Sequence, residues 1–379
     1  MGKTTGGRLV WASRYLTVAV FVVFWIAIGS MVVPQARNHD FLNIYTGASL
    51  ALDGHFDRLH DTDVQLARER EFVPETSVLV PFVRPHFYAL LLAPLALASF
   101  CPAFWIWLGI QAAVYAGFGW WAQNRLGGDS LVWWSLYLPG AIGIAHGQDS
   151  ALMLAILTVG FVLSERGWRF AAGLVWSLLL MKFHLCFGLA VALGAARMWR
   201  QTAGFACGGF VLSGASLALG GLTGLRCYLF MLTNDDLERL SPAPQKMVNF
   251  QGLMANIDFD GGWVLALGAA IGFGLLLAAA WKSSPRLALA AGIAGGLFAV
   301  PHVYLYDLTV LLLPLLLLME GFRSGPVRWM SALTLAPVMT FLVLFKPPWC
   351  VAGSFGLLAL LASLAWARRS GDLAEERHA

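Results

Sequence analysis

Charged residues are scarce in this chain, and their scarcity excludes an ordinary soluble domain. Asp, Glu, Lys and Arg make up 12% of the 379 residues, whereas hydrophobic residues make up 59%. A soluble globular protein carries roughly 25% charged residues. Apolar runs extend along most of the chain, so we expect a single all-α, polytopic membrane domain over residues 1–379.

Further absences narrow the function. The five cysteines include no CxxC pair, so we expect each of them to be a buried, inert thiol. No Gly-rich nucleotide loop is present, and no spacing of His, Asp and Glu indicates a dedicated metal site. We therefore expect no cofactor, no metal and no nucleic acid partner. The first apolar run, residues 15–33, lacks a small-residue cleavage site and should be a retained helix.

Lys and Arg near the ends of the apolar runs predict the topology, because cytoplasmic loops carry an excess of both. Basic residues precede the first run and then recur at alternate loops: Lys3, Arg8, Arg14, Arg125, Arg166, Arg169, Arg197, Arg200, Lys282, Arg286, Arg323, Arg328, Arg368 and Arg369. We predict about twelve crossings with both termini in the cytoplasm. Two polar stretches, about 34–85 and 223–261, then form external loops.

One region conflicts with this topology. Residues 86–122 contain two apolar segments but must cross the membrane an odd number of times. Either Pro94 and Pro102 break a short re-entrant piece, or one boundary is misplaced.

The stretch 38–54 places a carboxylate, Asp40, just after the first apolar run. Apolar residues then recur at helical spacing, which predicts an amphipathic helix lying in the membrane interface: Phe41, Ile44, Tyr45, Ala48 and Leu52. Two roles for Asp40 are open. It could be the N-cap of this helix, or it could be a general base that takes a proton from a hydroxyl.

Polar residues also gather at five later places between apolar runs, all on the outer face of the predicted topology. Polar groups at membrane depth cost a few kcal/mol each and usually serve a function. Arg and Lys could hold a phosphate there. The candidate substrate-binding residues are Arg84, His86, Gln148, Lys182, His184, Gln251, His302, Tyr306 and Asp307.

Simpler roles are open for several of these residues. Arg84 and Lys182 could extend to the lipid headgroups. Asp149 could cap the helix that follows it. Gln148 and Gln251 could bond to freed backbone groups.

The order of these segments resembles glycosyltransferase family eighty-seven. The motifs are DFLNIYTGA from Asp40, RPHFYALLLAPL from Arg84, GQ-x-S from Gly147, the downstream Lys182 and PH-x-x-x-YD from Pro301. That family groups membrane transferases of the GT-C fold, including the mycobacterial polyprenol-phosphate-mannose-dependent enzyme of phosphatidylinositol mannoside synthesis. By this resemblance Asp40 matches the aspartate that serves as general base, and His302 matches a histidine of the late PH motif.

The chain departs from the family pattern at three places. Arg84, Pro85 and His86 stand where Tyr-Pro-Pro is common, Ser150 ends the usual GQ-x-N motif, and Phe183 replaces the proline of a Lys-Pro pair. These departures concern the donor sugar and the acceptor more than the fold.

The resemblance and the residues together predict an inverting hexosyltransferase of the cell membrane. It would move a sugar, with mannose as first choice, from a polyprenyl-phosphate donor to a lipid or glycan hydroxyl on the outer face. Asp40 would activate the hydroxyl, while Arg84, Lys182 and His302 would stabilise the departing phosphate. The alternative is a secondary transporter of an anionic or sugar-like substrate, a class that often has repeated halves, and we find no repeat here.

Overall fold

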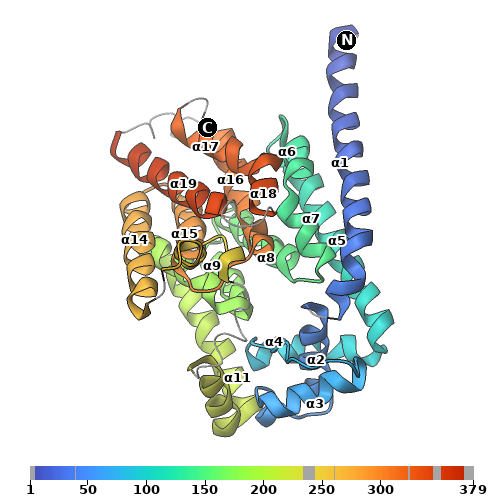
Figure 1. Cartoon of the computed structure of the whole chain (residues 1–379). Helices are drawn as coiled ribbons and strands as arrows, with labels where there is room; N and C mark the ends of the chain where they lie inside the picture. The colour runs from blue at the N-terminus through green and yellow to red at the C-terminus, as the bar shows by residue number, and fades with distance from the viewer. Residues whose placement is uncertain are drawn as a thin grey trace.

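The computed structural model describes residues 5–38, 40–233, 244–259, 261–322, 325–344 and 351–370, and this part of the chain is helical without a strand (Figure 1). The long helices are α1 (Thr5–Arg37), α5 (Phe100–Arg125), α11 (Trp199–Thr233), α14 (Gly262–Ala280) and α19 (Val351–Ser370). The shorter α-helices are α2 (Asp40–Leu52), α3 (Thr62–Phe72), α4 (His86–Leu92), α6 (Ser130–Leu136), α7 (Leu138–Ala145), α8 (Ser150–Glu165), α9 (Arg169–Ser177), α10 (Cys186–Ala195), α13 (Phe250–Ala255), α15 (Pro285–Ala299), α16 (Leu312–Gly321), α17 (Pro326–Leu335) and α18 (Pro337–Leu344). Five 3-10 helices connect them: η1 (Phe56–Arg58), η2 (Ala93–Leu97), η3 (Leu178–Leu185), η4 (Pro244–Lys246) and η5 (Leu305–Leu311).

The all-α membrane class is confirmed, but the described helices of spanning length are fewer than the twelve or so crossings predicted. The five long helices are long and apolar enough to cross, and the pair α17 and α18, bent by 56°, makes a sixth if it counts as one span. Other apolar segments are broken. Residues 130–145 divide into α6 and α7, and residues 169–195 divide into α9, η3 and α10, each shorter than the roughly 20 residues a crossing needs.

The conflict in residues 86–122 is resolved by a short piece followed by one span. α4 and η2 together cover only His86–Leu97, whereas α5 is a single helix of 26 residues. Pro102 lies in the first turn of α5, where its missing N–H breaks no helical hydrogen bond.

The first predicted external loop folds over the end of the bundle. We name its residues 40–85 the cover. α2 packs against α3, α4 and η2, and ten of its thirteen residues are buried. The predicted helix is present as α2, but protein covers its polar face as well, and its position relative to the membrane interface stays a prediction. A Cβ on Gly47 would lie 2.5 Å from the ring of Phe82, so this close packing requires glycine.

The second predicted external loop is partly helical. α11 continues to Thr233, past a kink at Gly221, where φ is 61°. Residues 234–243 and 260 lie outside the described part of the chain. In the remainder, the Val248 N–H donates to the Val303 carbonyl at 3.0 Å, so this segment lies beside the loop that carries His302.

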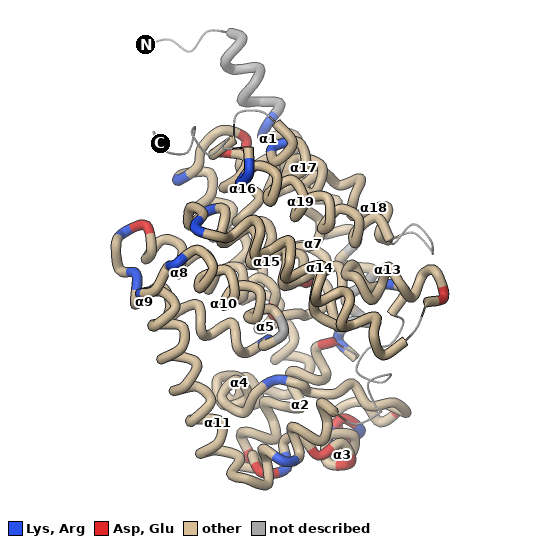
Figure 2. Tube along the Cα trace, turned by 90° about the vertical axis from the view of Figure 1, so that its left-hand side faces the viewer, with Lys and Arg blue, Asp and Glu red and all other residues tan. Residues whose placement is uncertain are grey.

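Ion pairs join helix ends that lie far from α2. Arg125 of α5 contacts Glu165 of α8 at 3.1 Å, and Arg286 of α15 contacts Glu165 at 3.8 Å and Glu320 of α16 at 3.0 Å. Figure 2 shows the charged residues around α8, α9 and α16, well separated from a second group around α3. Several loops predicted to be cytoplasmic therefore lie side by side.

The cysteines follow the packing of their helices. Cys186 is buried as predicted, whereas Cys101 and Cys207 are exposed, because α5 and α11 pack only part of their surface against protein. Cys227 is half-buried, and Cys350 lies outside the described residues.

Candidate functional site

Asp40 is the first residue of α2, and two side chains from a distant segment bind its carboxylate. Nδ1 of His146 lies 2.7 Å from Oδ2, and the Gln148 amide donates to Oδ1 at 2.9 Å. The side chain of Asp40 is 24% exposed, so a ligand can still reach it. A carboxylate accepts about four hydrogen bonds, which leaves capacity for a hydroxyl. We name these three residues the carboxylate centre.

The turn after α7 brings His146 and Gln148 to Asp40. Gly147 has φ of 69°, a conformation that favours glycine, and its carbonyl accepts the indole N–H of Trp107 at 2.7 Å. A Cβ on Gly147 would lie 3.1 Å from Cβ of Phe41, the residue after Asp40. The glycine therefore lets the turn lie directly against the start of α2.

Two cations and two carboxylates form a second cluster, which we name the ion network: Arg84, Asp149, Lys182 and Asp307. Nη2 of Arg84 lies 2.9 Å from Oδ2 of Asp149. Nζ of Lys182 lies 3.7 Å from Oδ1 of Asp149 and is bonded to Oδ1 of Asp307. Each of the four side chains is at most 8% exposed. Buried charges are costly unless they are compensated, and here the formal charges cancel.

Local backbone features place the members of the ion network. His60 donates from Nε2 to the Arg84 carbonyl at 2.8 Å, which ties the segment before α4 to the cover. Lys182 has φ −129° and ψ 67° and so interrupts the helical path of η3. Asp307 accepts the Tyr304 N–H on Oδ2 at 2.9 Å at the start of η5. The charged side chains of the ion network thus come from loops and helix starts, where few backbone hydrogen bonds form within the segment.

The ring of Tyr306 connects the two clusters. Its centroid lies 5.1 Å from Nζ of Lys182 and 6.1 Å from the ring of His146. The Tyr304 ring lies 5.8 Å away and packs edge-on against His302. The Tyr306 ring therefore lies close to both the carboxylate centre and the ion network.

His302 is neutral at pH 7. Burial lowers the pKa of His302 to about 4, the neighbouring Asp307 opposes this shift, and Lys182 and Arg84 add to it. The role of His302 at a phosphate stays a prediction. A neutral imidazole can bind a phosphate by donating a hydrogen bond, but it brings no positive charge.

The structure brings together seven of the predicted site residues: Asp40, Arg84, Gln148, Lys182, His302, Tyr306 and Asp307. His86 instead packs against His60 and Tyr228, under Gly220 and Gly224 of α11. Gln251 is half-buried in α13, beyond these contacts. The side chain of His184 lies outside the described residues.

The simpler roles fail for most of these residues. Arg84 and Lys182 are too buried to extend to lipid headgroups. Gln148 bonds to Asp40 rather than to freed backbone. Asp149 precedes α8 but makes no side-chain cap bond, so the predicted cap is wrong. Its charge compensates Arg84 and Lys182 instead.

Sequence reasoning missed His146 as a partner of Asp40 and Asp149 as a member of the ion network. Both flank the Gly147–Gln148 pair that carries the family resemblance. The polar residues that flank Gly147 and Gln148 between two apolar runs were the sequence feature that could have indicated both roles.

Burial of Glu69 of α3 makes the free energy of unfolding depend on pH. It is fully buried, and its Oε2 accepts the Val80 N–H at 3.2 Å, while Oε1 has no hydrogen-bond partner in the described part of the chain. Burial raises the pKa of Glu69 to about 7. The folded state thus holds this proton more tightly than the unfolded state. The stabilisation that protonated Glu69 provides is greatest below the pKa of Glu69 in the unfolded chain. It is lost as the pH rises through about 7.

Glu69→Gln is therefore expected to raise the midpoint of thermal unfolding at about pH 8.5 by a few degrees and to change it much less at about pH 5. Melting of the purified protein in detergent at the two pH values measures this difference. Glu75→Gln, at an exposed position of the same cover, is the matched control and should show no such pH dependence. Equal shifts for Glu69→Gln at both pH values would contradict the account.

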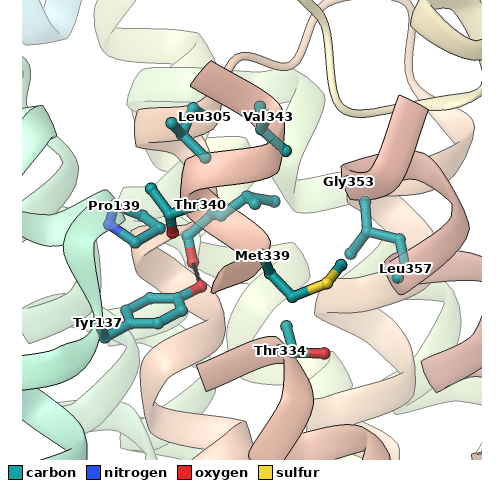
Figure 3. Close-up of a pocket in the computed structure, with 11 residues that line it drawn as sticks. Tyr137, Pro139, Leu305, Thr334, Met339, Thr340, Val343, Gly353 and Leu357 are labelled. Carbon is teal, nitrogen blue, oxygen red and sulfur yellow. Dashed lines mark hydrogen bonds between the residues drawn. The ribbon is translucent and has the colours of Figure 1, made fainter. Parts of the chain in front are cut away.

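An apolar pocket lies between α7, η5, α18 and α19 (Figure 3). Leu305 and Leu308 of η5 line it, and the Tyr137 hydroxyl donates to the Leu308 carbonyl at 2.6 Å. Asp307, between these leucines in sequence, bonds to Lys182 instead. The lining offers hydroxyl groups but no carboxylate or cation, so we assign the chemistry to the carboxylate centre and the ion network.

Among the described residues, no group of three or more His, Cys, Asp and Glu is placed to hold a metal ion. The absence of a metal from the reaction stays a prediction.

These features define a multi-pass membrane protein with a polar site beneath a folded cover. A family model described as glycosyltransferase family 87 matches residues 82–304, more than half of the chain. The chain belongs to glycosyltransferase family 87, and the predicted resemblance is confirmed. It is accordingly a membrane glycosyltransferase, and the transporter alternative has no comparable support. No curated protein and no solved structure matches the chain.

Proposed function

We propose that the protein transfers a sugar from a polyprenyl-phosphate donor to a hydroxyl of a lipid or glycan acceptor, with inversion at the anomeric carbon. Mannose is the proposed sugar, and GT-C is the proposed fold, on the family resemblance. The observation that carries the proposal is that the Tyr306 ring lies near both the carboxylate centre, where Asp40 is partly exposed, and the buried Lys182 of the ion network. Such a pair suits a reaction that removes a proton on one side and releases a phosphate on the other.

The donor phosphate would bind at the ion network. Nε of Arg84 has no hydrogen-bond acceptor among the described residues, although it is buried. An unpaired guanidinium donor is costly, and a phosphate oxygen would satisfy it. The network is formally neutral without a ligand, so we propose that Asp149 and Asp307 hold the two cations in place until the phosphate arrives.

In the proposed reaction, Asp40 provides the general base that makes the acceptor oxygen nucleophilic. That oxygen attacks the anomeric carbon while the bond from this carbon to the phosphate oxygen breaks. Polyprenyl phosphate leaves with the electron pair of that bond. Arg84 and Lys182 would stabilise the negative charge as it gathers on the phosphate, and such electrostatic stabilisation acts most strongly where water is excluded.

We further propose that both termini are cytoplasmic and that the cover, with the site beneath it, faces outside. The basic loops joined by the Arg125, Glu165 and Arg286 contacts would then lie on the cytoplasmic side. Lipid headgroups would surround the cover, and the polyprenyl-phosphate donor would enter from the bilayer.

Cysteine labelling tests this orientation. In a variant without native cysteines, Glu75→Cys should react in intact cells with a reagent that does not cross the membrane. Arg166→Cys should react only after permeabilisation. Both positions are exposed, so accessibility depends on the side of the membrane. The reverse pattern would overturn the orientation.

Deletion of the gene tests the proposed function in the cell. We expect the loss of a glycosylated lipid or glycan, the accumulation of its unglycosylated precursor, and recovery with the wild-type gene but not with Asp40→Asn. An unchanged set of lipids and glycans in the deletion strain would count against the proposal.

A further inference from the structure

His146 has the geometry of a proton acceptor held by a carboxylate. Its Nδ1 faces Oδ2 of Asp40 at 2.7 Å, and an ionised carboxylate can only accept a hydrogen bond. In the neutral imidazole the proton is therefore on Nδ1, and Nε2 is the atom with a lone pair. The His146 side chain is 35% exposed, against 24% for Asp40, so an acceptor that approaches the carboxylate centre meets His146 as well.

We propose that His146 takes the proton of the acceptor hydroxyl at Nε2, while Asp40 orients the ring and balances the positive charge that forms on it. This inference rests on the proposed function and refines it, since the general base becomes the Asp40–His146 pair. The acceptor O–H bond breaks, its proton passes to Nε2, and the oxygen bonds to the anomeric carbon as polyprenyl phosphate leaves. The imidazolium then releases its proton to water on the outer side.

The surroundings of the pair support this division of roles. Gln148 donates to the other oxygen of Asp40 and so restrains the carboxylate from rotating away from His146. Trp107 holds the turn between them through the Gly147 carbonyl. The charged and titratable groups that face the imidazole are Asp40 from α2 and, through its ring, Tyr306 from η5. A carboxylate that fixes one ring nitrogen and leaves the other available is the arrangement that makes histidine a general base in hydrolases.

Tyr306 lies close to both proposed ends of the reaction. The His146 ring lies 6.1 Å from the Tyr306 ring, and Nζ of Lys182 lies 5.1 Å from it. An inverting displacement needs the acceptor and the leaving group on opposite faces of the sugar ring. The proposal therefore has the acceptor approach the sugar from His146 and the phosphate leave towards Lys182.

A purely structural role for His146 makes a different prediction. If His146 only orients Asp40, glutamine should replace it well, because its amide can still donate a hydrogen bond to the carboxylate. If Nε2 receives the proton, the same change removes the acceptor, since an amide nitrogen is not basic. His146→Gln therefore separates the two roles while keeping a donor beside Asp40.

The test compares kcat/KM of the wild type and His146→Gln as a function of pH, with a polyprenyl-phosphate sugar as donor. We expect a loss of about a hundredfold or more. The acidic limb of the remaining activity should shift, because the only proton acceptor left at the carboxylate centre is a carboxylate and no longer an imidazole. Added imidazole should restore part of the activity of His146→Ala. His55→Gln, at an exposed histidine of the cover, should match the wild type.

Activity of His146→Gln within about threefold of the wild type, or a loss with an unchanged acidic limb, would overturn the role of His146 but leave the proposed function standing. Failure of the wild type to transfer sugar would overturn both. If His146→Gln does not fold, His146→Asn carries the same expectation.

Discussion

Asp40→Asn is expected to lower turnover by about a hundredfold or more, because general base catalysis contributes roughly that factor at least. Asparagine begins a helix about as well as aspartate does. It also keeps the size of the side chain, so the amount of folded protein in the membrane should not change. The amide presents one oxygen and one NH2 group where the carboxylate presented two oxygens, so either His146 or Gln148 then faces an NH2 group. Turnover and membrane yield, measured on the same preparation, check the prediction.

Asp40→Glu serves as the matched variant. It retains the charge but moves the carboxylate by one methylene, so partial activity is expected. Wild-type turnover in Asp40→Asn would show that Asp40 has only a structural role at the start of α2. That result would contradict the proposed mechanism.

Lys182→Met is expected to destabilise the protein by about 3–5 kcal/mol, because Asp307 would remain as a buried charge without its cation. Lys182→Met/Asp307→Asn should recover most of that loss. The asparagine oxygen can still accept the Tyr304 N–H, and the remaining Arg84–Asp149 pair stays neutral. Thermal unfolding in detergent, read as the difference between the single and the double variant, measures the coupling.

The control is Asp129→Asn. Its pair with Arg14 is partly exposed, and exposed ion pairs contribute little. Equal loss of stability in the single and double variants at Lys182 would show that the ion network is not coupled as described. A double variant that folds but transfers no sugar would agree with a role for Lys182 at the donor phosphate.

Several features of the site could be predicted because polar residues stand out in an apolar chain. Asp40, Arg84, Lys182 and Asp307 lie between hydrophobic runs, and the structure places all four in the two clusters. Motif order was sufficient for the family, which the match over residues 82–304 confirms. The basic loops near Arg125 and Arg286 were predicted to share one side of the membrane, and contacts with Glu165 bring their helix ends together, while the side itself stays a prediction.

Other features depend on tertiary contacts that sequence patterns do not carry. The spacing around Phe41 indicated one apolar face of α2, but packing with α3, α4 and η2 buries both faces. Asp149 stands at the position of a helix cap, but its carboxylate forms an ion pair with Arg84 and caps no helix. The described helices of spanning length are fewer than the predicted crossings, because composition does not show where Tyr137 or Lys182 interrupts a helix.

The anomeric configuration of the product tests the central claim most directly. The purified protein is incubated with a polyprenyl-phosphate mannose of known configuration and with membrane lipids as acceptors, and the new glycosidic bond is assigned by NMR. The account predicts transfer that depends on Asp40, with the configuration opposite to that of the donor. A product of retained configuration, or equal transfer by Asp40→Asn, would contradict it.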